Sequence, residues 1–512
     1  MSRLARVRNA VAARFSVDRR ALAALRVVLA AAVLVDLALR LPDVRAFYTD
    51  AGVLPRDLLF ELYPTLGRAS LHALSGALWW QYVLFACLGV AAVAMAVGYR
   101  TRLATVITAC LLISLQLRNP VVLNSGHSLL RRLLLWSALL PLGARWSVDA
   151  RHRSAEASAT DGADRGSGRV RSLAAAGLLV QVLAVYVVNA AVKARGDAWA
   201  AGTAGRLVFG MDALTVLLGD VVAGFPTLLT AGTYAWVALL VASPLLVLAT
   251  GRARAALVAA FAAGHVAMAL TLRLGVFPLV SLGALLPFLP SFVWERVERV
   301  VDDRLAPRAD AATDRLGLAA GSGARTPLLP STVRDLGAGS GRALAAALLA
   351  FVLVWNAAAL GLLALPASVT DTVDPEERRW DMFAPEPRST GGWWVTVGTT
   401  TTGERVDLSP GTASTAMPPD VDATYPGHRW YFYLTTLRDS PPPPAALGDR
   451  FPQYLCERWN RRHDSTLESA NVTFVARTVV LDGPDRIDVR PFGVTDCAGT
   501  EESDDGARAE TD

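Results

Sequence analysis

The segment Ser172–Trp199 reads SLAAAGLLVQVLAVYVVNAAVKARGDAW and is an apolar run of membrane-spanning length. A helix needs about 20 apolar residues to cross the hydrocarbon core of a bilayer. Near the end of this run stands Lys193, the only lysine of the chain. On a helix, Asn189 lies one turn before Lys193 and Tyr186 two turns before it, so the three side chains share one face. The segment therefore predicts a membrane helix with a polar stripe.

The position of Lys193 leaves two roles open. An ionisable residue in a membrane helix costs about 2.5–3.5 kcal/mol at mid-helix and less near an end. In one role, the ammonium group reaches from the helix end to the membrane interface. In the other, desolvation keeps the lysine amine neutral, so that it can act as a base; an arginine could not do this.

The composition favours a membrane protein over a soluble enzyme. Of the 512 residues, 53% are hydrophobic, and the mean hydropathy is +0.36. The sequence pI is near 9.2, but the arginines gather between apolar runs and no nucleic-acid motif is present, so we expect no nucleic-acid partner. The 4 cysteines lack metal-ligand spacing, so we expect no metal site.

The remaining apolar runs complete a polytopic bundle of about nine spans. We expect them near residues 21–39, 79–98, 103–117, 127–143, 234–250, 255–273, 276–294 and 342–365. Arginine clusters follow every second span, so all of them fall on one side, which the positive-inside rule makes cytoplasmic. The predicted protein is therefore a multi-pass cell-membrane protein with a cytoplasmic N-terminus. Residues 212–231 are apolar but broken by glycine and proline, which predicts a short interfacial or re-entrant element on the outer side.

After Pro366 the sequence becomes polar and strand-like, which predicts a small extracytoplasmic α+β domain. GGWWVTVGTTTTGERVDLSPG alternates in the manner of strands, and NVTFVARTVVL with RIDVRPFGV predicts a second strand pair. FPQYLCERWNRRHD favours a helix, whereas RWYFYLTTL fits either a strand or a helix. Cys456 and Cys497 are the only cysteines of this domain, and an oxidising compartment predicts that they form a disulfide.

The overall prediction is a mainly α fold with six regions. Residues 151–170 and 303–340 are rich in small and charged residues and are predicted to be disordered. The regions are a basic cytoplasmic N-terminus (1–20), the membrane helical domain (21–298), a disordered cytoplasmic linker (299–341), the last membrane helix (342–366), the extracytoplasmic α+β domain (367–500) and an acidic tail (501–512).

Three groups of polar residues could carry chemistry at the outer half of the bundle. The first joins Lys193, Asn189 and Tyr186 with Trp199. The second is RNPVVLNSGHSLLRR, and the third is His265 in GHVAMALTLRLGVFP. A lone histidine in a helix is more often a hydrogen-bonded core residue than a catalyst, but equal depth favours a shared site for His127 and Lys193. The second group contributes Arg118, Asn119 and His127.

Several of these motifs together resemble the HTTM domain, the membrane domain shared with vitamin K-dependent γ-glutamyl carboxylase. They are RNPVVLNSGHSLL, LLPLGARWSVDA, VYVVNAAVKARGDAWAAG and GHVAMALTLRLGVFP, in this order over about residues 20–295. The later stretch RRWDMFAPEPRSTGGWW resembles an outer segment common in prokaryotic members.

The resemblance implies a quinone-dependent chemistry. In the carboxylase a membrane lysine deprotonates the reduced quinone, which is oxygenated to a strong base that removes the γ-proton of a glutamate, and the carbanion captures CO2. By this resemblance Lys193 would be the base and His127 its hydrogen-bond partner. The cofactor would be a reduced naphthoquinone of the vitamin K type, and the substrate a Glu-containing protein or peptide. The pocket would be lined by Tyr186, Asn189, His265, Asn119, Arg118 and Trp199.

The alignment at the lysine leaves two functions open. The carboxylase has two adjacent lysines before the tryptophan, and the second is the base. Counted back from Trp199, Lys193 matches the first lysine and Ala194 the second. A shift of one residue would make Lys193 the base of a carboxylase-like lyase. Without that shift, the chain is predicted to be a non-catalytic membrane protein that binds lipid or a partner.

Overall fold

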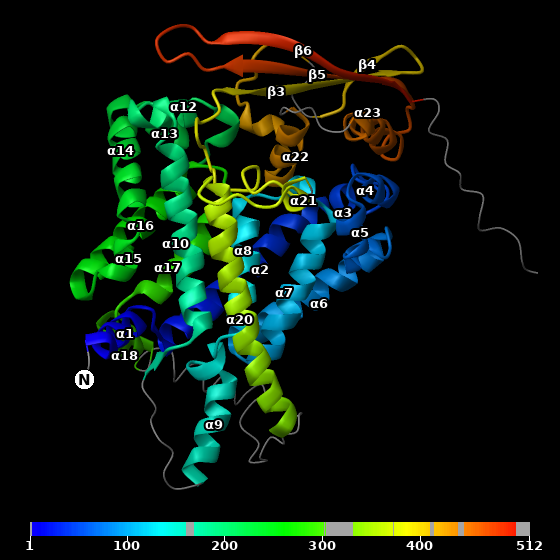
Figure 1. The fold of residues 1–512 in the computed structure, drawn as a ribbon. Helices are drawn as coiled ribbons and strands as arrows, with labels where there is room; N and C mark the ends of the chain where they lie inside the picture. Colours follow the sequence, from blue (N-terminus) through cyan, green and yellow to red (C-terminus); the bar gives the residue numbers. More distant parts are fainter. Residues whose placement is uncertain are drawn as a thin grey trace, which may run out of the picture.

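A bundle of helices carries a small β-sheet on one of its ends (Figure 1). The computed structural model describes residues 3–159, 168–301, 303, 331–371, 373–409, 414–438 and 445–497. The acidic tail, the proline run at 441–444 and most of the predicted linker lie outside these residues. The mainly helical class and the strands near the C-terminus agree with the sequence.

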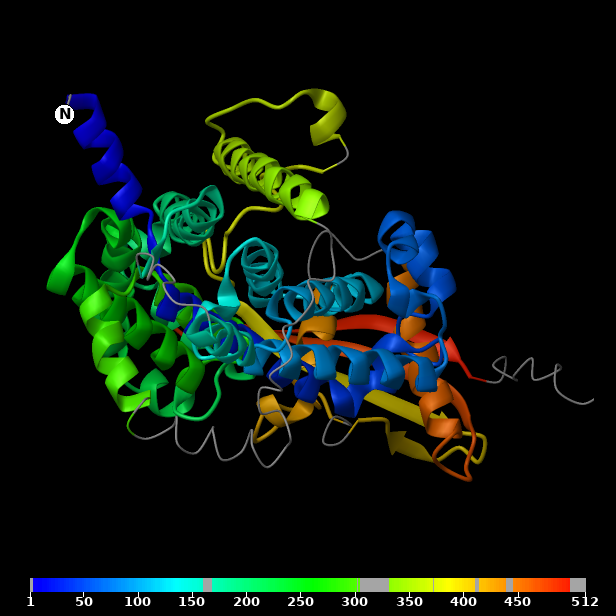
Figure 2. The same cartoon turned by 90° about the horizontal axis from the view of Figure 1, so that it is seen from below.

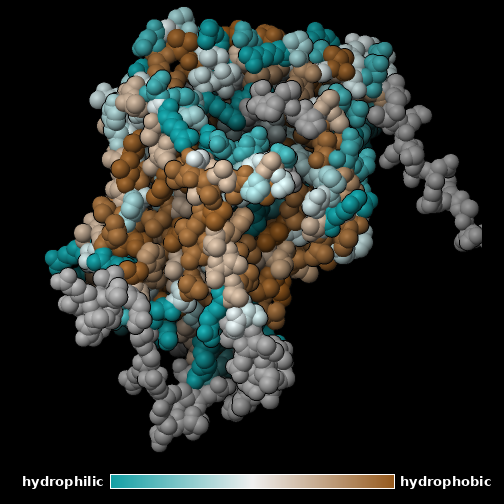
Figure 3. All heavy atoms as spheres, in the orientation of Figure 1, coloured by the Kyte–Doolittle hydropathy of each residue, from teal (hydrophilic) through white to brown (hydrophobic). Residues whose placement is uncertain are grey.

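The long helices run between the two ends of the bundle (Figure 1). The view from below shows how they are arranged beside one another (Figure 2). Among the described residues, six helices are long and apolar enough to cross a membrane. Figure 3 shows the corresponding band of hydrophobic surface along the bundle. The longer helices are α1 (Arg3–Arg14), α2 (Arg19–Arg40), α6 (Leu78–Val97), α7 (Thr101–Arg118), α8 (Ser125–Ala138), α9 (Val148–Ala159), α10 (Leu173–Lys193), α14 (Pro226–Ala242), α16 (Gly251–Thr271), α17 (Phe277–Leu285), α18 (Ser291–Val300) and α20 (Ser331–Ala359).

Helix α10 occupies a central place because it packs against α8, α14 and α20. The Ser172 side chain caps its first turn by accepting a hydrogen bond from the Ala175 amide, which satisfies one of the free amides of the helix start. Side chains such as Val182 and Val185 are buried along its length. The last residue of the helix is Lys193, so the lysine lies at the end of the bundle that carries the sheet.

The sheet and two helices form a layered cap over this end. The strands are β3 (Thr390–Thr400), β4 (Arg405–Asp407), β5 (Leu467–Thr478) and β6 (Arg486–Asp496), all antiparallel in the order β4-β3-β5-β6. Helices α22 (His428–Arg438) and α23 (Ala445–Asn460) lie between the sheet and the bundle (Figure 1). RWYFYLTTL is therefore a helix. A disulfide joins Cys456 and Cys497, as the sequence predicts.

Short helices complete the same end of the bundle. They are α3 (Val44–Tyr48), α4 (Arg56–Leu62), α5 (Pro64–Arg68), α11 (Asp197–Ala200), α12 (Ala204–Phe209), α13 (Gly219–Ala223) and α21 (Ala367–Thr370). The arginine-rich segments α1, α9 and α18 lie at the opposite end (Figure 1). The three arginine-rich segments thus lie together at one end of the bundle.

Several element boundaries differ from the sequence prediction. Residues 151–159, predicted to be disordered, continue helix α9, and Arg169–Val170 form strand β2, which pairs with Val17–Asp18 (β1). Helix α20 begins at Ser331, inside the predicted disordered linker. Residues 151–159 contain three alanines, which favour a helix despite the charged neighbours that suggested disorder, whereas residues 331–341 precede the apolar, alanine-rich part of α20 and extend it.

Prolines explain the other differences. Helix α14 starts at Pro226, where proline suits the first helical position, so the helix includes residues predicted to form an outer re-entrant element. Pro244 then separates it from the short α15 (Leu245–Leu248), so the predicted span near 234–250 is displaced towards the N-terminus. The expected span near 276–294 is broken by Pro287 and Pro290 into two helical parts that meet at 111°.

Candidate functional site

The amine of Lys193 is enclosed at the end of α10. The side chain is 2% exposed, and its Nζ donates a hydrogen bond of 2.5 Å to the carbonyl oxygen of Met382. The same Nζ lies 3.7 Å from the centroid of the Trp199 ring, which is a cation–π arrangement when the amine is charged. The predicted neighbours Lys193 and Trp199 are therefore brought together, and Met382 is a partner that the sequence did not indicate.

Residues 380–386, called the strap below, cover this site with their backbone. Asn189 Nδ2 donates to the carbonyl oxygens of Trp380 and Met382 at 3.2 and 3.3 Å. The indole Nε1 of Trp199 donates to the Phe383 carbonyl at 2.9 Å. Three side-chain donors thus point at the carbonyls of Trp380, Met382 and Phe383 in one short segment that contains a turn, which makes this a site for carbonyl oxygens.

The far end of the strap is held by helix α11. Both carboxylate oxygens of Glu386 accept from the Ala198 amide, at 3.3 and 3.2 Å. The strap approaches Gly196 so closely that a Cβ there would lie 1.9 Å from the Pro385 carbonyl oxygen. Phe383 has a φ of +56°, which non-glycine residues seldom adopt. The strap therefore has a closely specified path.

Tyr186, on the same face of α10 as Lys193, forms a second polar pair with His265 of α16. The Tyr186 hydroxyl lies 3.0 Å from His265 Nε2. Aromatic rings surround the pair: Phe261 is 4.5 Å from Tyr186, and Trp236 is 5.5 Å from His265, between ring centroids. The Nδ1 of His265 is buried without a hydrogen-bond partner among the described residues. The predicted residues Tyr186 and His265 thus bond each other, and the hydrogen bond of Lys193 goes to a different partner.

His127 has a different role from the expected one. Its Nδ1 accepts from the Asn124 amide at 3.0 Å and caps helix α8, so the ring proton is on Nε2. The Nε2 lies 3.1 Å from Asp36 Oδ1. Both ring nitrogens are therefore used, and within the described residues no hydrogen bond joins His127 to Lys193. The shared site expected from their equal depth is not formed.

Asp36 instead organises a separate buried charge cluster. Its carboxylate accepts from Arg40 Nε at 2.8 Å and from Arg429 Nη2 at 2.6 Å. Asp36, Arg40 and Arg429 are each at most 1% exposed, and Arg40 also bonds the Tyr48 hydroxyl. Because Asp36 and Arg40 lie within an apolar helix, the sequence places them facing the bundle interior. Arg429, nearly 400 residues away in the chain, gave no such signal.

Arg118 and Asn119 stabilise a loop rather than lining the lysine site. Arg118 Nη1 donates to the Leu54 carbonyl at 2.9 Å, and Asn119 Nδ2 donates to the Phe47 carbonyl at 2.9 Å. Both residues are fully buried. They hold α3 and the loop that follows it on the bundle, so the expectation that they bind a ligand next to Lys193 does not match their contacts.

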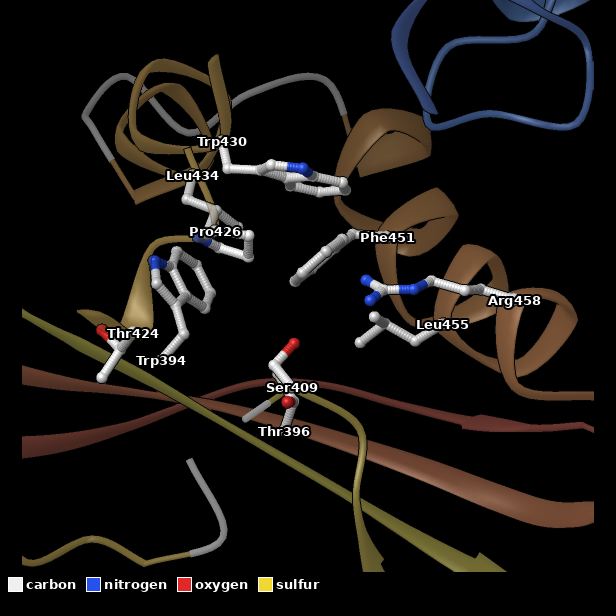
Figure 4. A pocket seen from close by; sticks show the side chains of 10 residues that line it. All are labelled: Trp394, Thr396, Ser409, Thr424, Pro426, Trp430, Leu434, Phe451, Leu455 and Arg458. Carbon is white, nitrogen blue, oxygen red and sulfur yellow. The ribbon is translucent and has the colours of Figure 1, made fainter. Parts of the chain in front are cut away.

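A small recess lies elsewhere, between strand β3 and helices α22 and α23 (Figure 4). Trp394, Trp430 and Phe451 line it, with Arg458 at one side. None of the residues predicted to bind a ligand contributes to it. The space in front of Lys193 is filled by the strap instead.

The fold and the site define the class of this chain as an integral membrane protein with a multi-helix bundle. The chain belongs to the HTTM domain family: the model of the HTTM domain matches residues 16–294. This range agrees with the segment over which the motifs resemble that domain. Comparisons with curated proteins and with solved structures found no match.

Proposed function

We propose that this protein binds a lipid-soluble naphthoquinone at Lys193, in the place that the strap now occupies. The single observation that supports the proposal is the pair of hydrogen bonds from Lys193 and Asn189 to carbonyl oxygens. A quinone offers two carbonyl oxygens to such donors and a flat ring to the indole of Trp199. The amine at the end of an apolar helix is also within reach of a ligand that arrives from the membrane.

The surroundings of Lys193 suit a base better than a fixed charge. Among the described residues its hydrogen-bond acceptor is a neutral carbonyl and its nearest ring is an indole, while the Asp381 carboxylate acts on it through space. An ammonium group that is buried without a hydrogen-bonded carboxylate is costly, whereas a neutral amine is not. A bound quinol would supply the reducing chemistry of a carboxylase-like lyase. Lys193 would take the proton from its hydroxyl group, and Asn189 would hold its other oxygen.

We also propose nine membrane crossings, with the N-terminus in the cytoplasm and the α+β domain outside. The shorter helices α8, α14 and α17 would add to the six long ones. Support comes from contacts at both ends of α8: Asn124 before it bonds the Leu274 carbonyl, and Trp146 after it accepts from Arg26. The arginine-rich end would then face the cytoplasm.

A non-catalytic function is the second candidate, and a specific observation favours it. His127 is fully engaged with Asp36 and Asn124, and in the part of the chain that the structure describes it makes no hydrogen bond to Lys193. In this alternative, Lys193 and Asn189 anchor the strap permanently and so hold the outer domain on the bundle. The protein would then bind a lipid or a protein partner through another surface.

Replacement of Lys193 by arginine separates the two candidates. Arginine is always charged, so Lys193→Arg should lower quinol-dependent fixation of labelled CO2 into Glu-containing peptides by about 10²–10⁴-fold if the lysine is the base. The matched control is Arg195→Lys, an exposed exchange two residues away, which should keep full activity. Folding of each variant would be checked by gel filtration in detergent.

Quinone content gives the second measurement. We expect naphthoquinone to co-purify with the wild type and to be lost in Asn189→Leu. Bound quinone without CO2 fixation or quinol oxidation would favour the non-catalytic candidate. A wild type that neither retains nor rebinds a naphthoquinone would overturn the proposed function.

A further inference from the structure

The strap uses every donor that a ligand at Lys193 would need. Lys193, Asn189 and Trp199 all donate to strap carbonyls at 2.5–3.3 Å. A buried donor that loses its acceptor carries a large free-energy penalty, so these three groups stay paired with one occupant or the other. With the strap in place Lys193 is 2% exposed, so a ligand carbonyl reaches the amine only when the strap moves.

We propose that the strap is an intramolecular competitor that closes the Lys193 site, and that ligand binds only after residues 380–386 leave it. This inference rests on the proposed function, because it assigns the regulation of the same site. The strap lies in the connection between helix α20 and strand β3, the yellow segment in Figure 1, and Thr390 at the start of β3 is paired with Thr478 of β5. Release of the strap therefore changes the path of this connection while the sheet stays paired.

The polar attachments of the strap fall into two groups: the carbonyls at the Lys193 site, and the Glu386 carboxylate on the Ala198 amide. Apolar contacts add to them, because Trp380 is buried in the core and Phe383 packs against the hydrophobic residues around Trp199. Asp381, Pro385 and Glu386 are themselves exposed. The left-handed conformation of Phe383 is maintained only while the surrounding contacts hold, and it would relax on release.

Closure by the strap has a quantitative consequence. When only a fraction of the molecules has an open site, the apparent dissociation constant equals the intrinsic constant divided by that fraction. A change that lifts the strap without touching the donors should therefore tighten ligand binding. It should not alter the donors' own contacts with the ligand.

Gly196 offers such a change. Its φ of −106° and ψ of +131° are allowed for alanine, so the backbone tolerates the substitution. A methyl group there would nevertheless lie 1.9 Å from the Pro385 carbonyl oxygen and 2.9 Å from the Glu386 carboxylate. Gly196→Ala should push the strap away while Lys193, Asn189 and Trp199 remain in place.

The experiment measures strap opening and ligand binding separately in the full-length protein in detergent. Hydrogen exchange of the peptide that covers the strap should be about tenfold faster in Gly196→Ala. The dissociation constant for menadione, followed by tryptophan fluorescence, should fall about tenfold. Glu386→Gln, which weakens the attachment to α11, should change both quantities in the same direction. Gly232→Ala is the matched control, because nothing lies within 4 Å of its Cβ, and it should change neither.

The outcomes distinguish the inference from the proposed function. Faster exchange in Gly196→Ala with unchanged menadione affinity would overturn the strap as a competitor while leaving quinone binding intact. Faster exchange with no menadione binding in either protein would instead refute the proposed function. Unchanged exchange in both Gly196→Ala and Glu386→Gln would show that the strap does not open and would overturn the inference.

Discussion

At the scale of single residues, Asp36 is a buried charge that helps to hold the α+β domain on the bundle. It is the carboxylate shared by Arg40 and Arg429, and all three are almost fully buried. Asp36→Asn would leave two guanidinium groups without this counter-charge, and breaking a buried pair costs about 3–5 kcal/mol. We expect a free energy of unfolding lower by that amount, measured by chemical denaturation in detergent.

The control for this change is an aspartate on the surface. Asp488→Asn removes a carboxylate that is 63% exposed, so the stability should stay within about 0.5 kcal/mol of the wild type. If Asp36→Asn were equally well tolerated, the charge cluster would not be what fastens α22 to α2.

His428, beside this cluster, should make the protein sensitive to acid. Burial, with a contribution from Arg429, lowers its pKa to about 3, whereas the unfolded chain has the ordinary value near 6.5. Between these values the unfolded chain binds a proton that the folded chain does not, so stability is full above pH 6.5 and is lost as the pH falls. His428→Gln should flatten the fall in melting temperature between pH 6.5 and 4, measured by tryptophan fluorescence. Parallel curves for the two proteins would contradict this reading.

At the scale of elements, periodicity and composition predicted the helices and strands whose formation depends only on their own local sequence. Helix α10 ends at Lys193, at the end of the predicted apolar run, and the strands β5 and β6 match their alternating segments. Boundaries failed where a proline could either start or end a helix, as at Pro226 and Pro244. Hydropathy alone does not distinguish these two effects.

The sequence predicted only those site residues that lie on one face of α10 or close to its end. Asn189, Lys193 and Trp199 meet because they are close in sequence, and Tyr186 finds His265 through the packing of two apolar helices. The Met382 carbonyl lies 189 residues from its donor, and a backbone acceptor leaves no trace in residue type. For the same reason equal membrane depth could not show that His127 faces Asp36 rather than the lysine.

At the scale of the whole molecule, the α+β domain and the bundle are joined by contacts at several separate points of their interface. Arg429 reaches Asp36, Trp430 Nε1 donates to Asp43 at 3.0 Å, and both Nε and Nη2 of Arg450 donate to the Gly52 carbonyl. Polar bonds at several points hold the cap in one orientation, so the strap beneath it connects two parts that are already docked. Opening of the strap therefore does not require the domain to leave.

The last prediction concerns the orientation of this assembly in the membrane. The background protein lacks the free cysteines Cys87 and Cys110. In one variant a cysteine replaces Ala10 on α1, and in a second variant a cysteine replaces Ser414 in the α+β domain. Both positions are exposed. Because arginine-rich segments stay in the cytoplasm, an impermeant maleimide should label Ser414→Cys in intact cells and Ala10→Cys only after permeabilisation. The parent without new cysteines controls for background. Labelling of Ala10→Cys in intact cells would show that the bundle has the opposite orientation, with the Lys193 end and its strap on the cytoplasmic side.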